Sequence, residues 1–138
     1  MRMPSKEKRA LERQKKLIFN KIKKHLVPYE TVLEAPTTYS EWYYKLIFTL
    51  PEEKRKPYID HLLFAYVRID KKDVSMYIMS VYRSHKFLEE APSLFEYFKR
   101  NNVFRFDNTH QVNEKELKKL LKHALQEFME RKKYYVEN

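Results

Sequence analysis

The sequence predicts an all-α fold, a compact bundle of five or six helices with at most one short strand or hairpin near residues 103–107. Three observations predict this class. Apolar side chains recur at helical spacing near both ends of the chain. Several segments begin with a capping-box pattern, in which Ser, Thr or Asn is followed three residues later by Glu. Only Val103 to Asp107 shows the strict alternation of a half-buried strand.

The first helix is expected from about Ser5 to Leu26. Leu11, Ile18 and Ile22 line up with Leu26 as one apolar stripe, and most of the basic residues of this segment fall off that stripe. The proline two residues after Leu26 ends the helix, because it disfavours helical backbone at the residue before it. The segment is therefore predicted to be a basic amphipathic helix.

The pattern Thr38-x-x-Glu41 predicts a second helix from about residue 39. Pro51 interrupts it, so that it either kinks or restarts as a third helix that ends at Ile69. Residues 29–37 fit either a short strand or an extended connector.

A fourth helix is expected from about residue 70 or 73 to residue 88. A short fifth helix is expected from Ser93, where Glu96 completes a capping box, to the pair Asn101-Asn102. Asparagine tolerates left-handed backbone, so this pair suits a helix end in a chain that has no glycine.

The last helix has the cleanest amphipathic pattern in the chain. Asn113 followed by Glu116 predicts its start. Its apolar stripe consists of Leu117, Leu120, Leu121, Ala124, Leu125, Phe128 and Met129.

The length of 138 residues suits a single domain with a substantial core. Within it, residues 1–27 are expected to form the basic helix and residues 28–138 an aromatic-rich helical body. Aromatic residues make up 15% of the chain, which is too many for a disordered tail.

The composition excludes several classes of site. Without cysteine there is no thiolate ligand, cysteine nucleophile or disulfide. Without glycine there is no Walker loop, dinucleotide fingerprint or nucleophile elbow. The five histidines lack the spacing of a metal site in a helical bundle. We therefore expect a protein that is not an enzyme and that has no cofactor or metal.

The net charge of +10 indicates a polyanionic partner, and ten Lys and Arg against two Glu in residues 1–24 account for most of it. The first hypothesis is a non-catalytic accessory or regulatory protein that binds DNA or RNA through its backbone phosphates. Lys99 and Arg100 at the end of the fifth helix, with Arg105 on the following strand, also match the element order of a winged-helix DNA-binding module. The candidate contacts are Arg9, Arg13, Lys16, Lys23, Lys24, Lys99, Arg100 and Arg105.

The second hypothesis is a protein-interaction module, such as an inhibitor, an adaptor or an assembly factor, with a homodimer as one form of it. Its contact surface would include Trp42, Tyr43 and Tyr44, because Trp and Tyr dominate the binding energy of many interfaces. The longest apolar runs fall well short of a membrane span, so no integral membrane association is expected and the cytoplasm is the expected compartment. The composition suits an accessory protein of a phage or mobile element.

Overall fold

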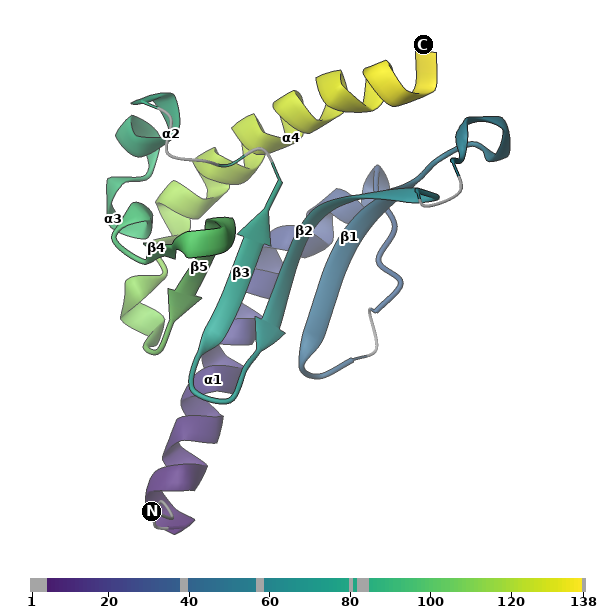
Figure 1. The fold of residues 1–138 in the computed structure, drawn as a ribbon. Helices are drawn as coiled ribbons and strands as arrows, with labels where there is room; N and C mark the ends of the chain where they lie inside the picture. Colours follow the sequence, from purple (N-terminus) through teal and green to yellow (C-terminus); the bar gives the residue numbers. More distant parts are fainter. Residues whose placement is uncertain (1–4, 38–39, 57–58, 80, 82–84, 138) are drawn as a thin grey trace.

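The protein forms a five-stranded antiparallel sheet with its two long helices on one face, as seen in a computed structural model (Figure 1). The structure describes residues 5–37, 40–56, 59–79, 81 and 85–137. The strands are β1 (Tyr43–Thr49), β2 (His61–Ile69), β3 (Val74–Ile78), β4 (Phe98–Lys99) and β5 (Val103–Phe106). The helices are α1 (Ser5–Leu26), α2 (His85–Glu90), α3 (Pro92–Phe95) and α4 (Glu114–Glu137).

The spatial order of the strands is β1-β2-β3-β5-β4, and every neighbouring pair is antiparallel. In Figure 1, α1 passes behind β2 and β3, and α4 crosses behind the upper end of the sheet. The front of β1, β2 and β3 carries none of the described helices. The sheet therefore has one covered face and one open face.

The prediction of an all-α bundle is wrong, because three segments assigned to helices form strands. The segment from residue 39 to Leu50 contains β1, the segment that ends at Ile69 contains β2, and the segment from residue 70 or 73 contains β3 before α2 begins. The helix expected from Ser93 shrinks to the four residues of α3. Parts of these predictions, at residues 38–39, 57–58, 80 and 82–84, lie outside the described residues.

The winged-helix interpretation also fails, because β3 occupies the place of its first helix. The body over residues 28–138 is a sheet with helices, not a helical bundle. Aromatic and β-branched residues dominate β1, and such residues favour strands when a partner strand is available. The pairing of β1 with β2 therefore decides the structure of this segment, in spite of the capping-box sequence at residues 38–41.

Other predictions are confirmed. The first helix spans Ser5–Leu26, the alternating segment forms β5, and α4 begins one residue after Asn113. Asn113 caps α4, since its side-chain oxygen accepts a hydrogen bond from the backbone N–H of Glu116 at 3.1 Å. Asn101 and Asn102 both have positive φ angles, which lets the chain reverse between β4 and β5 without glycine.

The core lies between the covered face of the sheet and the helices. Alternate strand residues such as Leu46, Met76 and Phe104 point into it and are fully buried. From the other side, both long helices contribute buried side chains. They are Ile18, Phe19, Ile22 and Leu26 of α1, and Leu117, Leu120, Leu121, Ala124 and Phe128 of α4. One continuous cluster of buried side chains thus joins the sheet to both long helices.

Glu116 links α4 to α3. Its carboxylate accepts hydrogen bonds from the backbone N–H groups of Ser93 and Leu94, at 2.9 and 3.0 Å. These N–H groups begin α3, where residue 91 provides no side-chain cap. The predicted capping partner Glu96 instead lies at the other end of α3, so this part of the helix prediction is wrong.

A buried lysine joins α1 to the turn between β2 and β3. The side chain of Lys15 is almost entirely buried, and its Nζ donates to the backbone oxygens of Asp70 and Lys71 at 2.9 and 3.0 Å. Nζ also forms an ion pair with Glu12 at 3.0 Å. A charged group is tolerated here because each of these oxygens replaces part of its hydration.

Replacing Lys15 with Met is expected to destabilise the protein by about 1–3 kcal/mol, because two turn carbonyls lose their donor. Urea unfolding followed by circular dichroism measures this. The neighbouring Lys16→Met variant is the matched control, since Lys16 is exposed, and its stability should stay within about 0.5 kcal/mol of the parent. Equal unfolding midpoints for the two variants would contradict the role of the Lys15 ammonium.

Candidate nucleic-acid interface

The first half of α1 extends beyond the sheet. In Figure 1 its N-terminal turns project below the turn between β2 and β3. Residues 5–10 are all exposed, whereas Ile18, Phe19, Ile22 and Leu26 are buried against the sheet. One helix therefore has a packed half and a solvent-facing half.

The structure separates the five candidate phosphate contacts of α1 into two groups. Arg9, Arg13 and Lys16 are exposed, and no acidic side chain in the described part of the chain forms an ion pair with them. Lys23 lies over the ring of Tyr44 at 5.3 Å, and Lys24 forms an ion pair with Glu114 at 2.7 Å. Lys23 and Lys24 thus contribute to the contact between α1 and the body, about 20 Å along the helix from Arg9.

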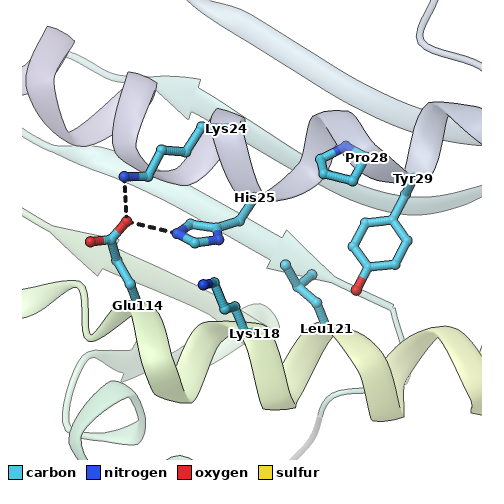
Figure 2. Close-up of a pocket in the computed structure, with 7 residues that line it drawn as sticks. All are labelled: Lys24, His25, Pro28, Tyr29, Glu114, Lys118 and Leu121. Atoms are coloured by element: carbon cyan, nitrogen blue, oxygen red, sulfur yellow. Dashed lines mark hydrogen bonds and ion pairs between the residues drawn. The ribbon is translucent and has the colours of Figure 1, made fainter.

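A groove of about 550 Å³ separates the end of α1 from α4 (Figure 2). Glu114 bridges Lys24 and the ring of His25, with an Oε1–Nε2 distance of 2.7 Å to the latter. Lys118 and Tyr29 also line the groove. Hydrogen bonds from Lys24 and His25 lower the pKa of the Glu114 carboxyl from 4.5 to about 2. The carboxylate is thereby held ionised between two donors and serves as a link between the helices.

The open face of the sheet collects polar and aromatic side chains from alternate strand positions. Across the strands, Tyr43 pairs with Arg68, Arg68 with Ser75, and Ser75 with Arg105. The next row begins at Lys45. Side chains two residues apart on a strand lie on the same face, so both rows point to the same side of the sheet.

The second row contains the residues that sequence reasoning missed. Lys45 pairs with Tyr66, and Tyr66 pairs with Tyr77. All three side chains are partly exposed, as expected for a face without a covering helix. Tyr66 lies in the segment that the sequence predicts as a third helix, and none of the three residues is among the predicted contacts. The alternation over residues 65–69 is the signal that could have found Tyr66 and Arg68.

Four aromatic rings form a continuous series across β1, β2 and β3. Trp42 lies 5.7 Å from Tyr43, Tyr43 lies 5.9 Å from Tyr66, and Tyr66 is stacked on Tyr77 at 5.6 Å between ring centroids. We call this series the aromatic ladder. Trp42 lies at the outer end of the ladder and is 57% exposed.

Tyr44, the third residue of the predicted partner-binding set, lies on the opposite face. It is fully buried, and its hydroxyl donates to Glu30 at 2.7 Å. Burial and the hydrogen bond to Glu30 raise the pKa of Tyr44. Trp42 and Tyr43 are therefore the surface members of that set.

Two arginines on the open face are oriented by aspartates. Arg68 Nε lies 2.8 Å from Asp70, and Arg105 Nη1 lies 3.2 Å from Asp70 and 3.1 Å from Asp73. A guanidinium group has five N–H donors, so these pairs leave each arginine with donors for a further anion. Between the arginines, Ser75 Oγ is buried and has no hydrogen-bond partner among the described residues.

Lys99 and Arg105 lie together at the far side of the same face. With Asp73 and Tyr97 they line a hollow of about 290 Å³. Arg100 is exposed on the short helical turn that joins β4 to β5. The open face thus brings together Trp42 and Tyr43, proposed as a protein contact, with Lys99 and Arg105, proposed as nucleic-acid contacts.

Comparison with models of known protein families, with curated proteins and with solved structures finds no match. Among the described residues, no group of three His, Asp or Glu side chains is placed to hold a metal ion. None of the described helices is long and apolar enough to cross a membrane.

Glu114→Gln is expected to lower stability at neutral pH, by less than about 1 kcal/mol because the site is partly exposed and screened. The native pKa of Glu114 lies below its unfolded value, so the stabilisation is complete above pH 4.5 and is lost as the pH falls towards about 2. Urea midpoints measured across this range should therefore converge for the two proteins. Glu41→Gln, an exposed acid with no ion pair among the described residues, is the control and should match the parent at neutral pH.

Proposed function

We propose that the protein is a non-catalytic nucleic-acid-binding protein whose projecting helix contacts backbone phosphates. One observation carries the proposal. The first half of α1 extends past the sheet and presents basic side chains that have no acidic partner among the described residues. These side chains are Lys6, Lys8, Arg9 and Arg13, and the exposed Lys16 follows them at the boundary with the packed half.

The charge of this region is available to a ligand because the structural lysines of α1 are different residues. Lys15 donates hydrogen bonds to the turn between β2 and β3. Lys21 donates to the backbone oxygen of Thr109 at 2.8 Å, and Lys24 forms an ion pair with Glu114. The projecting half contributes little to the packed core. Its positive charge is therefore better explained by an external anion than by folding.

The basic surface continues onto the body of the protein. Lys15 fixes the turn between β2 and β3 against α1, and this turn carries the exposed side chains of Lys71 and Lys72. Phosphates that lie along α1 can thus reach two further cations in this turn, Lys71 and Lys72. Contacts of this kind release counterions and give affinity without reading base sequence, in DNA and RNA alike.

A second candidate function is a protein-interaction module, and the exposed ring of Trp42 beside Tyr43 favours it. Apolar contact of this kind depends weakly on salt, whereas phosphate contact depends on it steeply. Salt dependence therefore separates the two functions.

Replacing Arg9, Arg13 and Lys16 with Gln together is expected to weaken binding to every nucleic acid by tenfold or more, because three phosphate contacts are lost. The slope of log affinity against log salt should also become less steep by about 2, since each phosphate contact contributes about 0.7 to 0.9. Fluorescence anisotropy with labelled oligonucleotides at a series of salt concentrations measures both quantities.

The matched control removes three positive charges from α4 with the exposed residues Lys115, Lys119 and Lys122 replaced by Gln. This variant has the same net charge as the α1 variant. If general attraction by the net charge of +10 caused binding, both variants would lose affinity equally, and the proposed role of α1 would be wrong.

A further inference from the structure

We propose that the open face of the sheet binds single-stranded nucleic acid, with unpaired bases stacked on the aromatic ladder and phosphates beside Lys45, Arg68 and Arg105. This inference rests on the proposed function and names its substrate class. It adds a second surface, because α1 packs on the covered face of the sheet and the ladder lies on the open face.

The ladder offers a row of aromatic rings, in which Tyr66 and Tyr77 are stacked at 19° and Tyr43 meets Tyr66 edge to face at 88°. Its rings follow one another at 5.6–5.9 Å and cross three adjacent strands. Aromatic side chains bind any base through the π-face, so such a surface takes single strands with little sequence preference.

Cations accompany the ladder along its length. Lys45 Nζ lies 5.9 Å from the centre of the Tyr43 ring, and the guanidinium of Arg68 lies 5.5 Å from that of Tyr66. Beyond Tyr77, the row continues through Val103 to Lys99, and Lys99 shares a hollow with Arg105 of the neighbouring row. A single nucleic-acid strand that runs across the sheet therefore passes aromatic rings that can stack on its bases and cations that can bind its phosphates.

A duplex cannot use this face in the same way. Its bases are already stacked and paired, so their π-faces are closed to protein side chains, whereas the bases of a single strand can turn outward. A second copy of this chain is also disfavoured as the occupant. It would bring a further charge of +10 to a face that carries four basic residues against three aspartates, Asp70, Asp73 and Asp107.

The open face and the projecting half of α1 can hold one ligand. Arg68 and Arg105 are bound to Asp70 and Asp73 at the turn between β2 and β3. Lys15 attaches the same turn to α1. A single strand that leaves the sheet at this turn is therefore led directly to the exposed basic residues of the helix.

The chain contains one tryptophan, Trp42, at the end of the ladder, and this gives a direct readout. The full chain is titrated with oligothymidine and oligouridine of about twelve nucleotides, within the range of site sizes on single-strand platforms. A duplex of the same length and inorganic polyphosphate, which has no bases, are titrated in parallel. Anisotropy or competition reports binding, and Trp42 emission reports stacking.

Single strands are expected to bind at least roughly tenfold more tightly than the duplex and to quench Trp42 emission. Polyphosphate should bind without quenching, because it reaches only the cations. The thymidine and uridine arms show whether DNA or RNA is preferred. Tyr66→Leu and Tyr77→Leu should each lower single-strand affinity by roughly fivefold or more. Both variants should bind polyphosphate as the parent does.

Tyr134→Leu is the matched control, since Tyr134 is exposed and lies outside the ladder. If a ladder variant fails to fold by circular dichroism, Trp42→Ala tests the same surface with a residue that is mostly exposed. It should lower single-strand affinity, whereas the control should leave it unchanged.

Three results would overturn the inference. Equal binding of duplex and single strands, with no quenching and no effect of the ladder variants, would remove the sheet from the interface and leave phosphate binding by α1 intact. No binding of any nucleic acid at physiological salt would reject the proposed function as well. A dimer in sedimentation that Tyr66→Leu dissociates would assign the open face to a second copy of the chain.

Discussion

The packing of α1 and α4 against a single face of the sheet is the constraint on which the rest of the structure depends. The buried residues of both helices meet the inward side chains of the strands, and together they form the one continuous core. Because the described part of the chain contains no further long helix, the other face of the sheet keeps its contact with solvent. That face then carries tyrosines, lysines and arginines that are only partly buried, instead of a second apolar layer.

The same helix serves both the fold and the proposed interface. Ile18, Ile22 and Leu26 are buried against the sheet, while the turns before Leu11 project from it. Lys15 lies at the boundary, where its ammonium exchanges water for the oxygens of a tight turn. The hydrogen bonds of Lys15 therefore fix the position of the basic turns relative to the open face.

The sequence correctly predicts the helices and the strand whose apolar residues recur with a clear helical or strand spacing. The apolar stripes of α1 and α4 lie in helices of 22 and 24 residues, and β5 alternates cleanly. The long strands were missed for a physical reason. In β2 a bulge at Phe64 interrupts the alternation, since Leu46 pairs with Ala65 and Ile47 with Leu63. Phe64 and Ala65 are both buried, so the segment reads as a continuous apolar run that fits a helix equally well.

The sequence by itself determined the basic N-terminal helix, the last helix, the alternating strand and the concentration of positive charge at one end, because these depend on residues that are close in the chain. Only the tertiary structure decided that Trp42, Tyr43, Tyr66 and Tyr77 form one row, and that Lys99 and Arg105 lie on the same face. Strand pairing joins residues that are far apart in sequence, and its register depends on the packing of the whole sheet. No local pattern encodes which strands become neighbours, so the candidate site appears only when the chain is folded.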